Sequence, residues 1–64
     1  MKRYIVYQKT DIVIAEISIN KEIPRQGNVL ILKEKNKKEV SRFQVVNVDF
    51  YYEDDLIKIR VLKF

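Results

Sequence analysis

The chain has 64 residues, 47% of them hydrophobic, which favours one folded domain, residues 1–64, near the lower size limit for independent folding. It contains no Cys and no His, which excludes disulfides and the usual zinc ligands, so stability must come from dense β-packing or self-association. Thirteen Lys and Arg against nine Asp and Glu give a net charge of +4, which mildly favours acidic partners but is also ordinary for a soluble domain.

Neither a leader peptide nor a membrane span is predicted. The N-terminal segment MKRYIVYQK has a basic start, but its apolar run ends before Gln8 and Lys9. No apolar run approaches the roughly 20 residues that a membrane helix needs. We therefore expect no membrane partner and take the cytoplasm as the default compartment.

Nearly every segment is rich in Ile, Val, Tyr and Phe, which suit the pleated surface of a β-sheet. A helix over residues 8–19 is disfavoured by the β-branched series Ile12, Val13, Ile14, Ile17 and Ile19. The pattern therefore predicts five strands, at residues 3–8, 12–19, 28–34, 39–52 and 56–63.

The third predicted strand lies between two turns. In EIPRQGNV, Pro24 fixes φ and Gly27 supplies a positive φ, so we interpret this segment as a turn or bulge. After the strand, the chain turns near Asn36, whose side chain tolerates the left-handed conformation. With a loop of residues 36–38, the register pairs Val29 with Val45, Ile31 with Phe43, and Lys35 with Glu39.

The last hairpin turns at the acidic segment EDD. Asp-Asp is a poor type I′ pair, so a four-residue loop, Glu53–Leu56, is favoured over a two-residue loop. In this register one face is apolar and the other polar, and a slip by one residue would mix them. The predicted pairs are Tyr52 with Ile57, Phe50 with Ile59, Val48 with Val61, Tyr51 with Lys58, and Asp49 with Arg60.

The two hairpins share residues 39–52 but disagree on which side chains face inward. Phe43 and Val45 face inward in the first hairpin, whereas Val48 and Phe50 do so in the second. One residue near Val45–Asn47 must therefore be extra, which predicts a β-bulge. We expect an all-β fold, a single small five-stranded barrel or a strongly bent antiparallel sheet, SH3-like rather than OB-like.

The segments PRQGNV and FQVVNV, within residues 24–48, resemble a pattern of small SH3-like barrels. That pattern is Pro-x-x-Gly-polar-Val opening a strand, followed by aromatic-x-Val-x-x-Val. Asn28 stands where the pattern often has Asp. Such barrels include short phage and mobile-element proteins, among them head–tail joining components, and the resemblance implies no catalytic residues.

The sequence contains few of the residue types that enzymatic catalysis uses. Ser18, Ser41 and Thr10 are the only hydroxyl nucleophiles besides tyrosines, and neither His nor Cys is present to assist them. Glu53, Asp54 and Asp55 lack the spacing of a calcium loop and suit a solvated turn. A single Gly excludes a glycine-rich phosphate loop. We therefore predict no enzyme activity, no catalytic residues, no cofactor and no metal site.

Nucleic-acid binding requires cations along a path and exposed aromatic rings for bases to stack on. The predicted middle hairpin is rich in lysine, and Tyr51 is expected on an outer face beside Lys58, although acidic residues surround it and dilute the lysine tract. A lysine-rich turn is more often simply solvated. The candidate contacts are Lys33, Lys35, Lys37, Lys38, Arg42, Tyr51 and Lys58.

A protein interface is the third alternative, because the expected outer positions are unusually apolar. The first and last strands would be open sheet edges available for pairing with another chain. The candidate interface residues are Ile12, Ile14, Leu30, Leu32, Leu62 and Phe64, unless longer-range packing within the chain buries them. We therefore predict a non-enzymatic protein-interaction or assembly module, a homo-oligomer, with nucleic-acid binding as the alternative.

Overall fold

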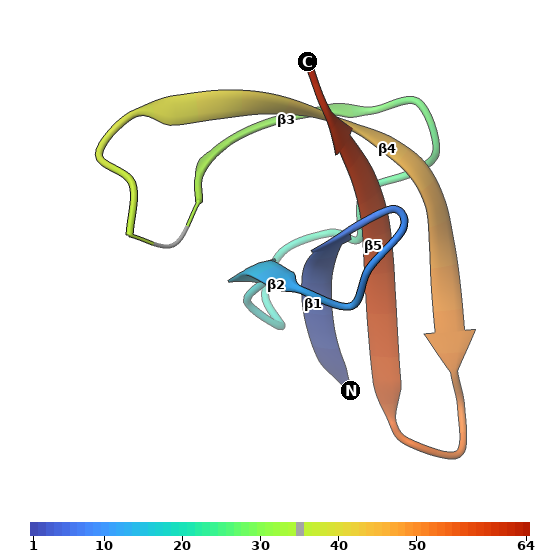
Figure 1. The fold of residues 1–64 in the computed structure, drawn as a ribbon. Coiled ribbons are helices and arrows are strands. Elements are labelled where there is room, and N and C mark those ends of the chain that lie inside the picture. The colour runs from blue at the N-terminus through green and yellow to red at the C-terminus, as the bar shows by residue number, and fades with distance from the viewer. Residues whose placement is uncertain (35) are drawn as a thin grey trace.

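A computed structural model describes residues 1–34 and 36–64 of the chain, which form an all-β fold (Figure 1). The described residues contain no helix, and therefore none long and apolar enough to cross a membrane. The strands are β1 (Lys2–Tyr7), β2 (Val13–Glu16), β3 (Val29–Lys33), β4 (Val40–Tyr51) and β5 (Leu56–Lys63).

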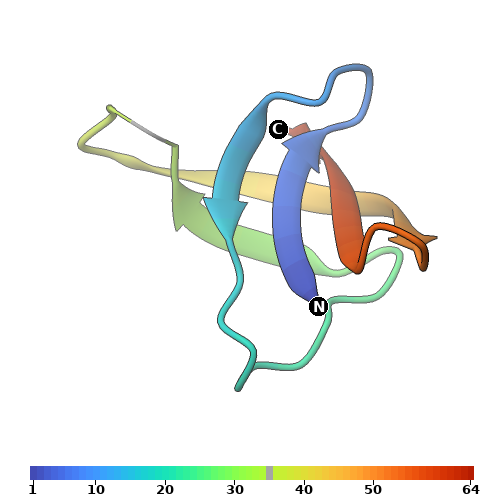
Figure 2. The same cartoon turned by 90° about the horizontal axis from the view of Figure 1, so that it is seen from below.

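The strands form one sheet in the order β2-β1-β5-β4-β3, which curls through 225° into a half-barrel. Seen from below, β1 and β2 cross in front of β3 and the first half of β4 (Figure 2). The expected five-stranded all-β architecture is confirmed, but the sheet is mixed because β1 and β5 run parallel. The prediction that the first and last strands form the edges is wrong, since both lie inside the sheet and the edges are β2 and β3.

The hydrophobic core fills the concave side of the curl. Its buried side chains come from four strands and are Ile5, Ile14, Phe43, Val45, Ile57, Ile59 and Val61. Alternate residues of β5 point inward, as expected for a strand with one face against a core. Tyr7 packs edge-on against Phe43, with ring centroids 6.2 Å apart.

The last hairpin has the predicted loop length but a different register. Its four-residue loop is Tyr52–Asp55, one residue earlier than expected, and Asp55 has a positive φ of 52°. Phe50 therefore faces Ile57, not Ile59, a displacement of two residues that leaves each side chain on its predicted face. The physical reason is the pairing of β5 with β1. Lys2 pairs with Leu56, so Leu56 belongs to the strand and not to the loop.

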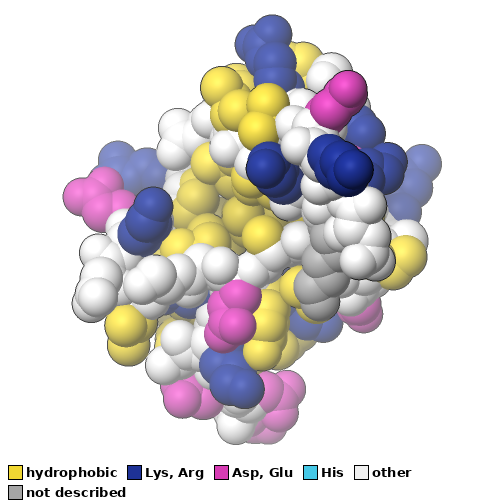
Figure 3. All heavy atoms as spheres, turned by 90° about the vertical axis from the view of Figure 1, so that its left-hand side faces the viewer, with side chains coloured by type: hydrophobic (Ala, Val, Ile, Leu, Met, Phe, Trp, Pro, Cys, Tyr) yellow, Lys and Arg dark blue, Asp and Glu magenta, His cyan; other side chains and the backbone are white. Residues whose placement is uncertain are grey.

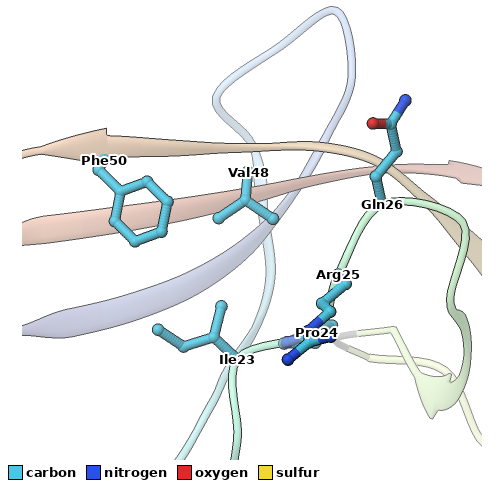
Figure 4. Close-up of a pocket in the computed structure, with 6 residues that line it drawn as sticks. All are labelled: Ile23, Pro24, Arg25, Gln26, Val48 and Phe50. Carbon is cyan, nitrogen blue, oxygen red and sulfur yellow. The ribbon is translucent and has the colours of Figure 1, made fainter.

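The displaced loop also corrects two core assignments. Phe50 and Tyr52 were expected inside, yet they are 47% and 77% exposed. Their rings stack on each other, with centroids 6.1 Å apart. Phe50 and Val48 point toward Ile23 and Pro24 across a shallow hollow of about 360 Å³ (Figure 4). The hollow lies where the segment after β2 crosses in front of β4, and it leaves the Phe50 ring partly in solvent.

The predicted bulge in β4 is confirmed. Val45 faces Val61 and Asn47 faces Arg60, so Val46 is the extra residue between two consecutive β5 partners. The bulge lets Val45 and Val48 both turn toward the concave side although they are three positions apart in the sequence. β4 can therefore bend and join the two layers of the half-barrel, as Figure 1 shows.

A second bulge shifts the middle hairpin by one residue. The N–H of Gly27 donates to the carbonyl of Val45 at 2.8 Å, and the N–H of Val45 donates to the carbonyl of Asn28 at 2.9 Å. Gly27 has φ of 89°, which confirms the turn or bulge predicted there. Because Gly27 and Asn28 both lie opposite Val45, Val29 faces Gln44 instead of Val45.

This shift exchanges the two faces of β3. Leu30 faces Phe43 and packs with Leu32 against the core, whereas Val29 and Ile31 point to solvent. The predicted pairing of Val29 and Ile31 with core residues is therefore wrong. Asn36 has the expected positive φ, 64°, and the predicted pair of Lys35 with Glu39 lies outside the described residues.

Candidate protein interface

Five exposed apolar side chains lie on the convex face of β3, β4 and the end of β5. We call them the apolar strip: Val29, Ile31, Val40, Leu62 and Phe64. The pairing of β3 with β4 and of β4 with β5 sets these residues on one face, in neighbouring rows. Ile31 and Phe64, which lie on either side of Arg42, are 68% and 60% exposed. Arg42 and Gln44 lie between these apolar side chains on the same face. Several exposed apolar side chains gathered on one sheet face are a common mark of an interaction surface.

Basic side chains accompany the apolar strip. The Arg42 guanidinium lies over the Phe64 ring, 4.9 Å from its centroid, and so covers part of the aromatic face. The side of the molecule that carries the β3–β4 hairpin has hydrophobic side chains in its middle, with Lys and Arg around them (Figure 3). Arg42 lies between Ile31 and Phe64, and Lys33 faces Val40, so basic side chains lie within the apolar strip itself.

The structure divides the residues predicted as an interface. Leu62 and Phe64 belong to the apolar strip, and Ile12 is exposed in the loop before β2, away from the strip. Ile14 is buried in the core, and Leu30 and Leu32 pack against it, so these three residues are not outer positions. The sequence does show that β3 carries apolar residues on both of its faces. The prediction missed Val29 and Ile31 because the Gly27 bulge reverses the phase of β3. It overlooked Val40, although alternation from Phe43 already places that residue on the outer face.

The residues predicted to contact nucleic acid lie in two separate places. Lys33, Lys37, Lys38 and Arg42 lie on or beside the β3–β4 hairpin, and Lys35 lies outside the described residues. Lys37 pairs with Glu34, with 3.7 Å between Nζ and Oε2. Tyr51 and Lys58 lie on the convex face of β4 and β5 at the other end of β4. The structure therefore does not bring the lysine tract and the tyrosine platform together.

Tyr51 and Lys58 are part of an ion-pair cluster centred on Arg60. Arg60 Nε donates to Asp49 Oδ2 at 2.7 Å, and Arg60 also donates to the hydroxyl of Tyr51 at 3.2 Å. The Lys58 ammonium lies 5.0 Å from the Tyr51 ring centroid and 3.1 Å from a carboxylate oxygen of Asp11. The predicted contact between Asp49 and Arg60 is therefore present, although Asp49 is paired in register with Lys58.

The charges in this cluster neutralise one another. The hydrogen bond from Arg60 holds the pKa of Asp49 below its usual range, and hydrogen bonds from Lys58 and Arg60 lower the pKa of Asp11. Hydrogen bonds to Asp49 and Tyr51 raise the pKa of Arg60. Two acidic and two basic groups are thus paired at neutral pH, and the Tyr51 ring is covered by Lys58. This arrangement stabilises the hairpin and offers little free positive charge to a phosphate.

Glu34 joins elements that are not neighbours in the sheet. Its carboxylate, just after β3, accepts a hydrogen bond from the Tyr7 hydroxyl on β1 and one from Lys63 Nζ on β5 at 2.7 Å. These bonds, that from Lys63 first, lower the pKa of Glu34 to about 2. The same carboxylate raises the pKa of Tyr7. Glu34 therefore fastens the end of β3 beside the apolar strip to the rest of the sheet.

No model of a protein family, no curated protein and no solved structure matches the chain. Residues 1–34 and 36–64 contain no cluster of three or more Asp, Glu, His or Cys that could hold a metal ion. Among the described residues, the apolar strip is the largest group of exposed apolar side chains on one face of the sheet.

Proposed function

We propose that this protein is a non-enzymatic protein-interaction or assembly module that self-associates through the apolar strip. The supporting observation is that five apolar side chains share one open face of β3, β4 and β5. Residues that only stabilise the fold would lie on the concave side, where Leu30 and Leu32 already pack. A fully solvated face would carry polar residues at all of these positions, whereas here only Lys33, Arg42 and Gln44 are polar.

The size of the apolar strip allows an estimate of association strength. Fully burying one Val, Leu, Ile or Phe side chain contributes about 1.5–3 kcal/mol. Because the strip residues are roughly half exposed, covering all five contributes on the order of 4–8 kcal/mol in each copy, or about 8–15 kcal/mol for two copies. Bringing two proteins together costs an estimated 4–15 kcal/mol. The strip alone therefore supports weak association, and a tight complex needs further contacts.

Light scattering over a concentration series tests this proposal. The unaltered chain should show a mass that rises with concentration, whereas Leu62→Lys and Val40→Lys should stay monomeric. Ile19→Lys is a matched control, because Ile19 is 69% exposed but lies outside the strip, after β2. A chain that remains strictly monomeric at millimolar concentration would contradict self-association.

Nucleic-acid binding is a second candidate, favoured by one observation. Lys33 and Lys38 form no ion pair within the part of the chain that the structure describes, so their charges are free to meet phosphate. Binding to single- and double-stranded DNA and RNA should then fall steeply as salt rises. Lys38→Ala should weaken it, and Lys58→Ala, which alters a paired lysine, should not. Absence of binding at low salt would remove this candidate.

A further inference from the structure

The open edge of β3 presents unpaired backbone groups in a regular pattern. Among the described residues β3 pairs only with β4. The N–H of Val45 bonds the carbonyl of Asn28, and hydrogen-bonded pairs alternate along an antiparallel ladder. Leu30 therefore bonds to β4, whereas the N–H and C=O groups of Val29, Ile31 and Lys33 point away from it, toward the open edge.

This edge lacks the features that usually prevent pairing with another chain. Natural edge strands are blunted by charges, proline or covering segments. β3 has the sequence VLILK, with its only charge at the last position. The other edge, β2, is four residues long and ends in Glu16. The segment after β2 is held by the Arg3 guanidinium, which donates to the carbonyls of Ile19 and Lys21 at 3.0 and 2.9 Å.

We propose that a second copy of this chain adds its β3 antiparallel to β3, with the two-fold axis at Ile31. This proposal rests on the self-association proposed above and adds a backbone contact at the β3 end of the apolar strip. The two strips then lie side by side on one face of a joined sheet. Ile31 would face Ile31 of the second copy, and Val29 would face Lys33 of the second copy. In each pair both residues present their free N–H and C=O groups, so the edge is complementary to itself. Any extended strand can form the same backbone bonds, but a second copy also brings apolar side chains to both faces of the pair, at Ile31 on one face and at Leu30 and Leu32 on the other.

The side chains on both faces suit the same arrangement. On the convex face the two Ile31 side chains meet at the axis and join the two apolar strips. On the concave face Leu30 would lie opposite Leu32 of the second copy. A hollow of about 330 Å³ lies beside β3, lined by residues 29–32 and by Ile5, Ile17, Lys21, Glu22 and Pro24. The added strand would cover this hollow, which the half-barrel leaves open.

Charge and area are also compatible with a second copy. Lys33 in one copy and Lys33 in the other would be four residues apart along the paired strands, about 14 Å at 3.4 Å per residue. This exceeds the Debye length of about 8 Å at physiological salt, so their repulsion is screened. A standard interface buries about 800 Å² per partner, roughly one-sixth of the 4848 Å² surface of this chain. The five-residue β3 edge, with Ile31 and the hollow beside it, supplies only part of that area, so a stable dimer needs further contacts.

Reciprocal charge variants test the two-fold axis. Ile31→Lys and Ile31→Glu each place like charges opposite one another at the axis, so each alone should be monomeric in light scattering. An equal mixture should regain the dimer mass, because opposite charges then face each other. Ile19→Lys and Ile19→Glu are the matched controls and should associate like the unaltered chain, alone or mixed. A mixture of Ile31 variants that stays monomeric would contradict the proposed pairing.

A cysteine variant tests the same contact covalently. The chain has no Cys, so Ile31→Cys introduces a single thiol. Hydrogen-bonded partners in an antiparallel pair have Cα atoms about 5.5 Å apart, within the range of about 4.4–6.8 Å that disulfides span. Mild oxidation should therefore yield a covalent dimer from Ile31→Cys well above the yields from Ile19→Cys and Val40→Cys.

The outcomes separate this inference from the proposed function. If the unaltered chain associates but Ile31→Cys cross-links no better than Ile19→Cys, the β3 pairing is wrong and self-association stands. If the unaltered chain is a monomer at all concentrations, both fail. Circular dichroism of each variant verifies that the β-sheet is retained, and Ile31 is suited to this because its side chain is 68% exposed.

Discussion

Replacing Leu30 and Ile31 separately by alanine tests the register of the middle hairpin, on which the position of the apolar strip depends. The two residues are neighbours in β3 with isomeric side chains, so the substitutions remove similar apolar volume. In the observed register Leu30 faces Phe43 and packs against the core, and Ile31 faces Arg42 on the convex side. The alternative register, which pairs Ile31 with Phe43, reverses these roles.

The expected magnitudes differ enough to be measured. A fully buried Leu→Ala change costs about 2–5 kcal/mol. Leu30 is only partly buried, so we expect a loss of about 1.5–3 kcal/mol in the free energy of unfolding. Ile31→Ala removes a mostly exposed side chain and should change it by no more than about 0.5 kcal/mol. A chain of 64 residues has roughly 3–10 kcal/mol in total, so the first change is a large fraction.

Urea denaturation followed by far-ultraviolet circular dichroism is a suitable assay. Small proteins lose about 1 kcal/mol or more per molar urea, so Leu30→Ala should lower the midpoint by about 1–3 M. Ile31→Ala should leave it nearly unchanged at protein concentrations too low for association. If Ile31→Ala were the more destabilising of the two, the register and with it the apolar strip would be wrong.

Three further changes probe other parts of the fold. Phe43 is fully buried, so Phe43→Ala should cost about 3–5 kcal/mol and leave much of the chain unfolded, as its circular dichroism should show. Gly27→Ala places a Cβ where φ is 89° but no atom lies within 4 Å, so urea denaturation should show only the backbone cost of about 1–2 kcal/mol. The folded-state pKa of Glu34, about 2, lies below its usual 4.5, so its stabilising effect is full above 4.5 and lost as the pH falls toward 2. In Glu34→Gln the melting temperature should therefore fall less between pH 4.5 and pH 2 than in the unaltered chain. An equal fall in both proteins would contradict the role of Glu34.

The bulge at Val46 could be predicted because it has a local cause. Phe43 and Val45 demand one phase of alternation and Val48 demands the other, and only an extra residue reconciles them. The all-β architecture follows for the same reason, since β-branched and aromatic residues alternate in most segments. The ion pair of Asp49 with Arg60 was also within reach, because a displacement by two residues keeps both side chains on one face.

The registers and the interface residues depend on contacts that are distant in the sequence. The pairing of Lys2 with Leu56 sets where β5 begins, and no pattern within the last hairpin reveals it. Similarly, the sequence identifies Gly27 as a turn residue, but it does not reveal that Gly27 and Asn28 both bond to the backbone of Val45. Because of this one-residue bulge, Leu30 packs against the core and Ile31, which was predicted to do so, points to solvent. The candidate site was therefore mispredicted by one residue on β3, although its elements were assigned correctly.

The same bulges explain why the exposed apolar face and the open edge coincide. After the Gly27 bulge, the residues of β3 with free backbone groups are Val29, Ile31 and Lys33, and these are also the residues whose side chains point outward. Had the register followed the simple alternation, Leu30 and Leu32 would have been the outward residues and Ile31 would face the core. Ile31 therefore combines an apolar side chain on the convex face with free backbone groups at the edge. A charged variant at Ile31 disturbs the face at the point where the two β3 strands would meet, whereas Leu62→Lys alters the face away from the edge. Comparing their effects on association measures how much the contact at the β3 edge adds.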